Sequence, residues 1–151
     1  MLIQEKALAD ITWDDIQHLV DTATPEGPTL EFKSGLTYEP HAKNAQPSNE
    51  ENRREKTRDL VGPEIVAFAN AYGGTLIIGV EEDRQEPKPA VGTVPITDIH
   101  KRVEALEKAV KAKIEPPIAG LSFRAVLKPG EKEAGAIVVR IPASNAAPHG
   151  F

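Results

Sequence analysis

Cysteine is absent from this chain of 151 residues, which excludes disulfide bonds and zinc sites with cysteine ligands. No apolar run approaches the roughly 20 residues that a membrane-spanning helix requires, and the N-terminus lacks the apolar core of a signal peptide. The four histidines show no ligand spacing, and there is no Walker-type phosphate loop to indicate ATP binding. We therefore expect a cytoplasmic protein without an ATP site.

An excess of basic residues is also lacking. The 18 lysines and arginines are outnumbered by 23 aspartates and glutamates, which gives a formal net charge of −5. This balance argues against a dedicated duplex-DNA binder, because such proteins usually carry a clear basic surface. The composition is that of one ordinary globular domain, which we place at 1–151. The last residues do not resemble a domain terminus, so further domains C-terminal to Phe151 stay an open alternative.

Helical periodicity and capping residues predict three helices. The first begins after Thr12, whose side chain can cap it while Asp15 completes a capping box. The second ends at Tyr72, because Gly73 can adopt the positive φ of the residue after a helix. The third runs from a cap at 97 or 98 to about 114. The second helix turns one apolar face to the core, formed by Ile65, Phe68, Ala69 and Tyr72.

Two stretches with different hydrophobic patterns predict the strands that carry or precede the candidate site residues. Around Glu31 apolar and charged residues alternate, so Leu30 and Phe32 face the core while Glu31 and Lys33 share the other face. The run 75–80 is apolar without alternation, which is typical of a strand covered on both faces. We expect its carboxyl end to lie at the rim of the sheet, where sites of α/β proteins usually form.

The remaining strand signals lie in the second half of the chain. Residues 121–127 and 136–141 flank a turn with Pro129 and Gly130 in favoured positions, which predicts an antiparallel hairpin. Residues 90–94 read as a short edge strand. The order of elements indicates a mixed α/β domain.

Between 35 and 56 the chain loses its periodicity, and the part from 41 onward contains no large apolar residue. We interpret 35–56 as a polar, mobile loop. Two roles are open for it: a disordered insertion, or a flap that orders over a bound ligand.

Four acids can meet near the rim of the sheet: Glu26, Glu31, Glu81 and Glu82. The Gly27-Pro28 turn can return Glu26 to the side of Glu31, and the last two follow the buried run 75–80. Carboxylates held together raise one another's pKa. A hard divalent cation such as Mg²⁺ or Mn²⁺ would relieve the repulsion and could activate water at a phosphate. The alternative is a set of ordinary solvated glutamates.

Several motifs together resemble the Schlafen-type AlbA-like domain, which is also described as a divergent AAA-type or RecG-related DNA-binding domain. The resemblance covers roughly 12–149. It rests on Glu31-Phe-Lys33, Ala67-Phe-Ala-Asn-Ala-Tyr-Gly-Gly74, Leu76-Ile-Ile-Gly-Val-Glu-Glu82, and Ile137-Val-Val-Arg-Ile-Pro-Ala-Ser144 with Pro148-His149. It implies an α+β fold in which a mixed, largely antiparallel sheet packs with about three helices.

The resemblance also implies interaction with nucleic acid. Nuclease members of the family hold a metal ion with three acids, and the matching residues here are Glu26, Glu31 and Glu82, which are thus the candidate catalytic and metal-binding residues. Glutamate stands at 82 where the family commonly has aspartate. The cofactor implied is Mg²⁺ or Mn²⁺.

Basic residues offer candidate contacts to phosphate. Lys33 shares a face with Glu31 and can contact a phosphate or neutralise that acid, although a plain surface lysine fits equally well. The densest basic cluster is Arg53, Arg54, Lys56 and Arg58. It is interleaved with acids, so a solvated helix face is the alternative to phosphate binding.

These observations support three functional hypotheses. The first is a nucleic-acid-interacting domain that acts as a metal-dependent endoribonuclease. The second is a non-catalytic DNA-binding or transcriptional-regulator module, which can form a homodimer through a sheet edge. The third is a protein-interaction module of a multidomain protein. The sequence does not distinguish RNA from DNA as the partner.

Overall fold

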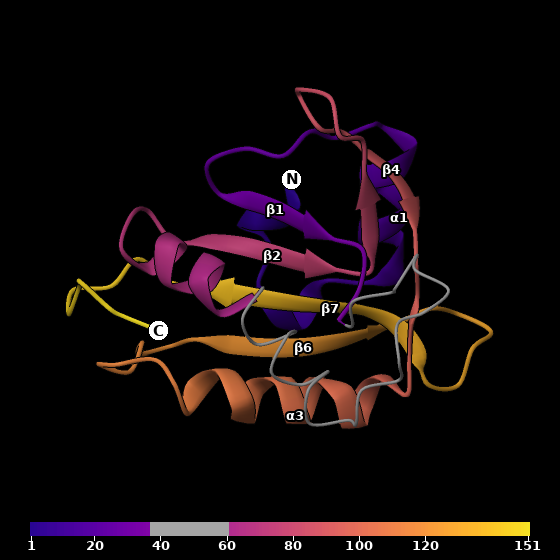
Figure 1. The fold of residues 1–151 in the computed structure, drawn as a ribbon. Coiled ribbons are helices and arrows are strands. Elements are labelled where there is room, and N and C mark those ends of the chain that lie inside the picture. Colours follow the sequence, from indigo (N-terminus) through magenta and orange to yellow (C-terminus); the bar gives the residue numbers. More distant parts are fainter. Residues whose placement is uncertain (37–60) are drawn as a thin grey trace, which may run out of the picture.

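A five-stranded sheet forms the centre of the structure, a computed structural model that describes residues 1–36 and 61–151 (Figure 1). The strands of the sheet are β1 (Leu30–Lys33), β2 (Gly74–Ile78), β5 (Ile96–Thr97), β6 (Ser122–Leu127) and β7 (Ala134–Ile141). β1 pairs with β2 in parallel, whereas β2, β5 and β6 all pair with β7 in antiparallel fashion. The expected α+β fold with a mixed, largely antiparallel sheet is therefore confirmed.

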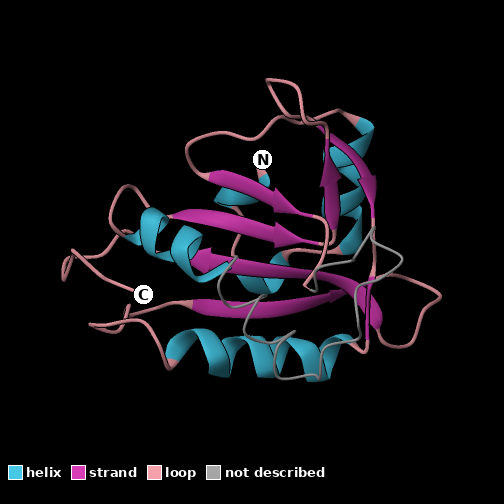
Figure 2. Ribbon diagram, viewed as in Figure 1, coloured by secondary structure: helices cyan, strands magenta, loops and turns pink. Residues whose placement is uncertain are grey.

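Helices cover both faces of this sheet (Figure 2). α1 (Trp13–Asp21) and two short 3-10 turns, η1 (Ile3–Glu5) and η2 (Leu8–Asp10), lie on one face. A helix at 61–69 and α3 (Ile99–Lys111) lie on the other. Each face has its own apolar core, since alternate residues of β2 and β7 point to opposite sides. The sequence of β2 is apolar without alternation because both faces of the strand are covered in this way.

Local capping signals were largely predictive. Thr12 is the N-cap of α1 and forms the capping box with Asp15, as expected. Gly73 has the predicted positive φ of +75°, and its N–H donates to the carbonyl of Phe68 at 2.7 Å. The helix that precedes it ends at 69, however, before Tyr72. The prediction of Tyr72 as a core residue is therefore wrong, because the tyrosine lies in the turn and is 83% exposed.

The second half of the chain also follows its sequence pattern closely. β6 and β7 form the predicted hairpin around the turn at Pro129 and Gly130. α3 ends at Lys111, three residues before the predicted end at Ile114. Its N-cap is Asp98, but with φ of +53° and without a side-chain capping hydrogen bond.

The predicted strand at 75–80 is not continuous. It breaks at Gly79, whose φ of +113° is a conformation that side-chain-bearing residues rarely adopt. β3 (Val80–Glu82) then leaves the main sheet and pairs with β4 (Ala90–Thr93) in a separate two-stranded sheet. In Figure 1 these two strands run across the direction of β1 and β2. The predicted strand at 90–94 thus exists as β4, and within the described residues its strand partner is β3.

The loop predicted at 35–56 lies almost wholly outside the described residues. Leu36, which is described, is buried in the core together with residues of the helix at 61–69. Within the described residues, no helix has the length and apolar character needed to cross a membrane.

Candidate functional site

The site forms on the face of β1 that is turned away from α1. Leu30 and Phe32 point into the core beneath α1, as the alternating pattern predicted. Glu31 and Lys33 consequently point to the opposite face, where the helix at 61–69 packs. In the described part of the chain β1 pairs only with β2, so it forms an edge of the sheet. An edge position leaves these two charged side chains partly accessible to solvent.

A tight turn returns Glu26 to β1. The N–H of Gly27 donates to the carbonyl of Leu30 at 3.0 Å, and the N–H of Leu30 donates back at 3.3 Å. Beyond this turn, the backbone N–H of Phe32 donates to Oε2 of Glu26 at 2.9 Å. The carboxylate of Glu26 is therefore fixed beside the residue that follows Glu31. The Gly27-Pro28 turn thus returns Glu26 to the side of Glu31, as the sequence predicted.

Glu82 reaches the same place because of the break at Gly79. The N–H of Gly79 donates to the carbonyl of Lys33 at 2.7 Å, which anchors the departure point of β3 to the end of β1. Glu81 and Glu82 are neighbours in β3, so their side chains point to different sides, and the pairing register with β4 shifts between them. Glu81 is exposed, and its carboxylate lies over Gly92 of β4. Glu82 instead approaches Glu26, which helps to raise the pKa of Glu82.

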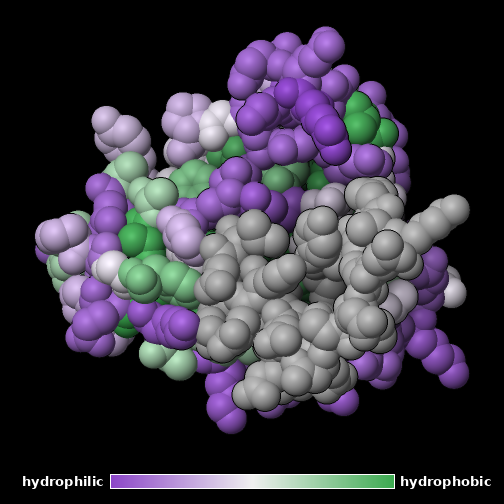
Figure 3. Space-filling model, in the orientation of Figure 1, coloured by the Kyte–Doolittle hydropathy of each residue, from purple (hydrophilic) through white to green (hydrophobic). Residues whose placement is uncertain are grey.

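The backbone also holds the loop between β3 and β4 against the segment before β1. The N–H of Glu26 donates to the carbonyl of Lys88 at 3.3 Å, and Pro25 and Pro89 form an isolated bridge. This loop is mainly hydrophilic at the surface (Figure 3). These main-chain contacts bring the segments of Glu26 and Glu82 together, and the two carboxylates are close for that reason.

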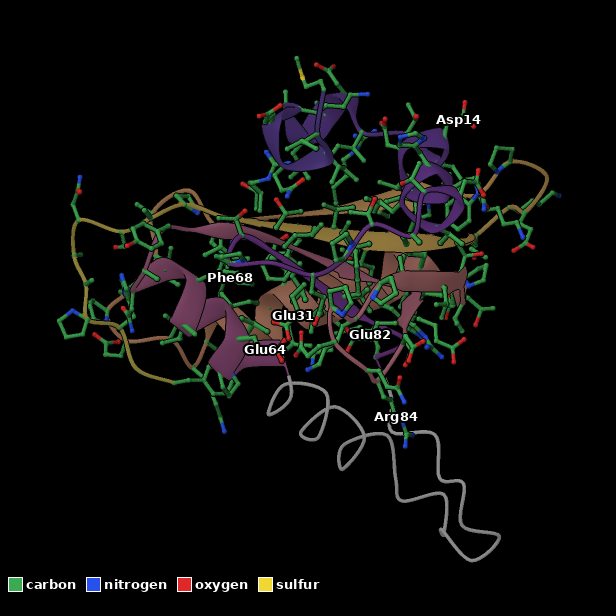
Figure 4. All side chains as sticks on the ribbon, turned by 90° about the horizontal axis from the view of Figure 1, so that it is seen from above. Asp14, Glu31, Glu64, Phe68, Glu82 and Arg84 are labelled. Carbon is green, nitrogen blue, oxygen red and sulfur yellow. The ribbon has the colours of Figure 1, made fainter. Side chains whose placement is uncertain are left out.

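A fourth acid that the sequence analysis did not identify joins the site. Glu64 lies in the first described turn of the helix at 61–69, and its carboxylate faces β1. Figure 4 shows Glu31, Glu64 and Glu82 close together, with Asp14 far away on the opposite face of the sheet. A single acid on a helix is too common to indicate a site. The one sequence feature that could have indicated Glu64 is its position next to Ile65, on the apolar face of this helix.

Burial and repulsion raise the pKa of two of these acids. For Glu31, burial, the charge of Glu64, and a hydrogen bond to Glu64 raise the pKa to about 7. For Glu82, burial together with a hydrogen bond to Glu26 and the charge of Glu26 also raises the pKa to about 7. The four carboxyl groups thus form two interacting pairs, Glu31 with Glu64 and Glu26 with Glu82.

The charge of Lys33 acts on both pairs. Its Nζ is 2.7 Å from Oε1 of Glu64. Burial alone would lower the pKa of Lys33, but the hydrogen bond and charge of Glu64, with the charges of Glu31 and Glu82, raise it above its ordinary value of 10.5. A charged ammonium group is therefore held among the acids.

The donor set has the chemistry that a hard divalent cation prefers. All candidate donors are carboxylate oxygens, and Oε2 of Glu64 and Oε2 of Glu82 are buried without a hydrogen-bond partner among the described residues. The arrangement is not that of a preformed cage, since no group of three acidic or histidine side chains in 1–36 and 61–151 is placed to hold an ion. Rotation of at least one side chain would be needed.

The structure thus brings together Glu26, Glu31, Glu82 and Lys33 of the predicted site residues. The predicted basic cluster, formed by Arg53, Arg54, Lys56 and Arg58, lies outside the described residues.

Comparison with known proteins identifies the family of the chain. The family model of Schlafen, AlbA_2 matches residues 26–150. No match was found among curated proteins. Among solved structures, the chain is similar to the DIP2311 protein from Corynebacterium diphtheriae, with a TM-score of 0.46 and 19% sequence identity. That similarity covers 89% of this chain but only 22% of the other. On the family match, which extends over most of its length, the chain belongs to the Schlafen, AlbA_2 family.

Proposed function

We propose that this chain is a nucleic-acid-interacting domain that cleaves RNA with the help of a divalent metal ion. Membership of a nucleic-acid-associated family supports the first part of the proposal. One observation carries the second part: Glu26, Glu31 and Glu82 come from three separate backbone segments and converge on one side of β1.

Each residue has a definite task in this proposal. Glu26, Glu31 and Glu82 would hold Mg²⁺ or Mn²⁺, an ion that can supply an activated water and stabilise charge on a phosphate. Lys33 stands beside them with a positive charge and would contact a phosphate of the bound strand. Arg53, Arg54, Lys56 and Arg58 would add further contacts to the backbone. The hydrogen bond from Phe32 keeps Glu26 in place throughout.

The experiment that tests this proposal is cleavage of a structured RNA hairpin in the presence of Mn²⁺ or Mg²⁺. We expect Glu31→Ala to reduce the cleavage rate by about 100-fold or more, because it removes one of the three proposed metal ligands. Glu104→Ala is the matched control, since Glu104 is an exposed glutamate on α3. Equal cleavage by the wild type and Glu31→Ala, or cleavage that persists in EDTA, would refute the proposal.

Binding without cleavage is the second candidate, and two observations favour it. No three acids in the described ranges stand ready to hold an ion, and a glutamate occupies position 82. This candidate is a non-catalytic DNA-binding or regulatory module. It predicts binding that weakens steeply with salt, no cleavage with any divalent ion, and loss of affinity in an Arg53→Glu/Arg54→Glu variant. Binding that this charge reversal leaves unchanged would count against it.

A further inference from the structure

Glu64 and Lys33 form the best-defined ion pair of the site. Nζ of Lys33 is 2.7 Å from Oε1 of Glu64, and only about a quarter of each side chain is exposed, 28% for the lysine and 25% for the glutamate. Such a partly buried pair is less screened by water than a surface pair. The other oxygen of Glu64 is buried and has no hydrogen-bond partner among the described residues. Among the described residues, Lys33 is the cation that pairs with Glu64.

Glu64 itself is rigidly placed. The helix at 61–69 packs into the core through Ile65, Phe68 and Ala69, all of them buried. The backbone of the first described turn of this helix cannot move far without disturbing that packing. Glu64 can thus act as a fixed anchor for a long and flexible partner.

Lys33 has two other acids within reach. Glu31 is two residues earlier on the same face of β1, and Glu82 is close enough for its charge to act on the lysine. If the ammonium group were released, it would pair with one of these two carboxylates. A lysine bound in that way would occupy the oxygens that the proposed function assigns to a metal ion.

We propose that Glu64 is a positioning residue that keeps the ammonium group of Lys33 in its own ion pair. The lysine then does not close onto the nearby Glu31 or Glu82, and these carboxylates can receive a divalent cation. This inference rests on the proposed function, and it gives Glu64 a role that is separate from metal ligation. The cation competes with Lys33 for the same oxygens, and Glu64 decides that competition.

The test is Mn²⁺ binding to the complete chain, measured by isothermal titration calorimetry without nucleic acid. We expect Glu64→Gln to weaken Mn²⁺ binding by about 5- to 10-fold, because the neutral amide no longer retains the lysine. The double variant Glu64→Gln/Lys33→Met should restore binding to the wild-type level. A role of Glu64 in folding alone would not be repaired by removal of the lysine. Glu107→Gln is the matched control, since it breaks the exposed Glu107–Lys111 pair on α3.

The outcomes separate this inference from the proposed function. Wild-type protein that binds no Mn²⁺ would overturn both. Wild-type binding that Glu64→Gln leaves unchanged, or a double variant that stays as weak as the single one, would overturn only the role of Glu64. Circular dichroism checks that each variant folds. If Glu64→Gln does not fold, Glu64→Asp and Lys33→Met decide: the aspartate should weaken binding because its reach is shorter, and the methionine should not.

Discussion

Replacement of Glu31 by glutamine should stabilise the protein at pH 8. The pKa of Glu31 is raised from its ordinary value of 4.5 to about 7 in the folded chain. Between these values the folded state holds a proton that the unfolded state releases. The free energy of unfolding therefore falls as the pH rises from about 4.5 to 7, and the loss is complete above the folded pKa. Glutamine has no charge to bury, so it avoids that loss.

The size of the effect follows from the same two pKa values. A difference of about 2.5 between them corresponds to about 3.4 kcal/mol, at 1.36 kcal/mol per pKa unit. Glu31 is only half-buried and solvent screens its charge, so we expect roughly 1–2 kcal/mol at pH 8. For a chain of this length, that gain raises the melting temperature by about 2–8 °C. At pH 5 most of the gain should be absent.

The assay is urea unfolding at pH 5 and pH 8 in EDTA, followed by the fluorescence of the single tryptophan, Trp13. Metal-free buffer is needed because a bound cation would favour the ionised carboxylate. Glu104→Gln, at an exposed site on α3, controls for the general effect of removing one negative charge. If Glu31→Gln destabilises the protein equally at both pH values, Glu31 does not titrate as argued and the acids are not coupled.

Two further predictions concern the frame of the site. Asn70→Ala should lower the free energy of unfolding by about 1–3 kcal/mol, since the Asn70 side chain donates to the carbonyl of His149 at 3.1 Å and accepts from its N–H at 2.8 Å. Limited proteolysis should then cut the C-terminal segment faster. Unchanged cleavage would show that these two hydrogen bonds do not hold the segment. Gly74→Ala should cost about 1–3 kcal/mol in urea unfolding, because a Cβ there would lie 2.4 Å from the ring of Phe68. Gly27→Ala, where a Cβ meets nothing within 4 Å, is the control and should change stability much less.

Features that depend on neighbouring residues were predictable from the sequence. The capping box of Thr12 and Asp15 needs only four residues to form, and the hairpin turn at Pro129 and Gly130 is equally local. The alternation around Glu31 also identified which side chains of β1 face the core. In each case the pattern reports a short-range geometry that the rest of the fold does not override.

Features that depend on distant contacts were not predictable. The apolar run 75–80 gives no sign that Gly79 turns the chain out of the sheet, because glycine is compatible with both a continuous strand and a break. Glu64 is brought to β1 only by the packing of its helix on the sheet. Asn70 bonds the backbone of His149, which is 79 residues away, and the residues around Asn70 do not indicate this contact.

The stability that the clustered acids cost the protein indicates that they are placed for a function. A glutamate kept for solubility would be placed where water solvates it fully, yet Glu31 and Glu82 are partly buried and each lies against another acid. Such an arrangement lowers stability at neutral pH, and the fold does not require it, since Phe32 and Leu30 on the other face of β1 already form the packing of the strand. Strained titratable clusters of this kind concentrate at functional sites. The backbone devices that create the cluster, the turn at Gly27 and the break at Gly79, therefore serve the placement of carboxylates more than the packing of the core.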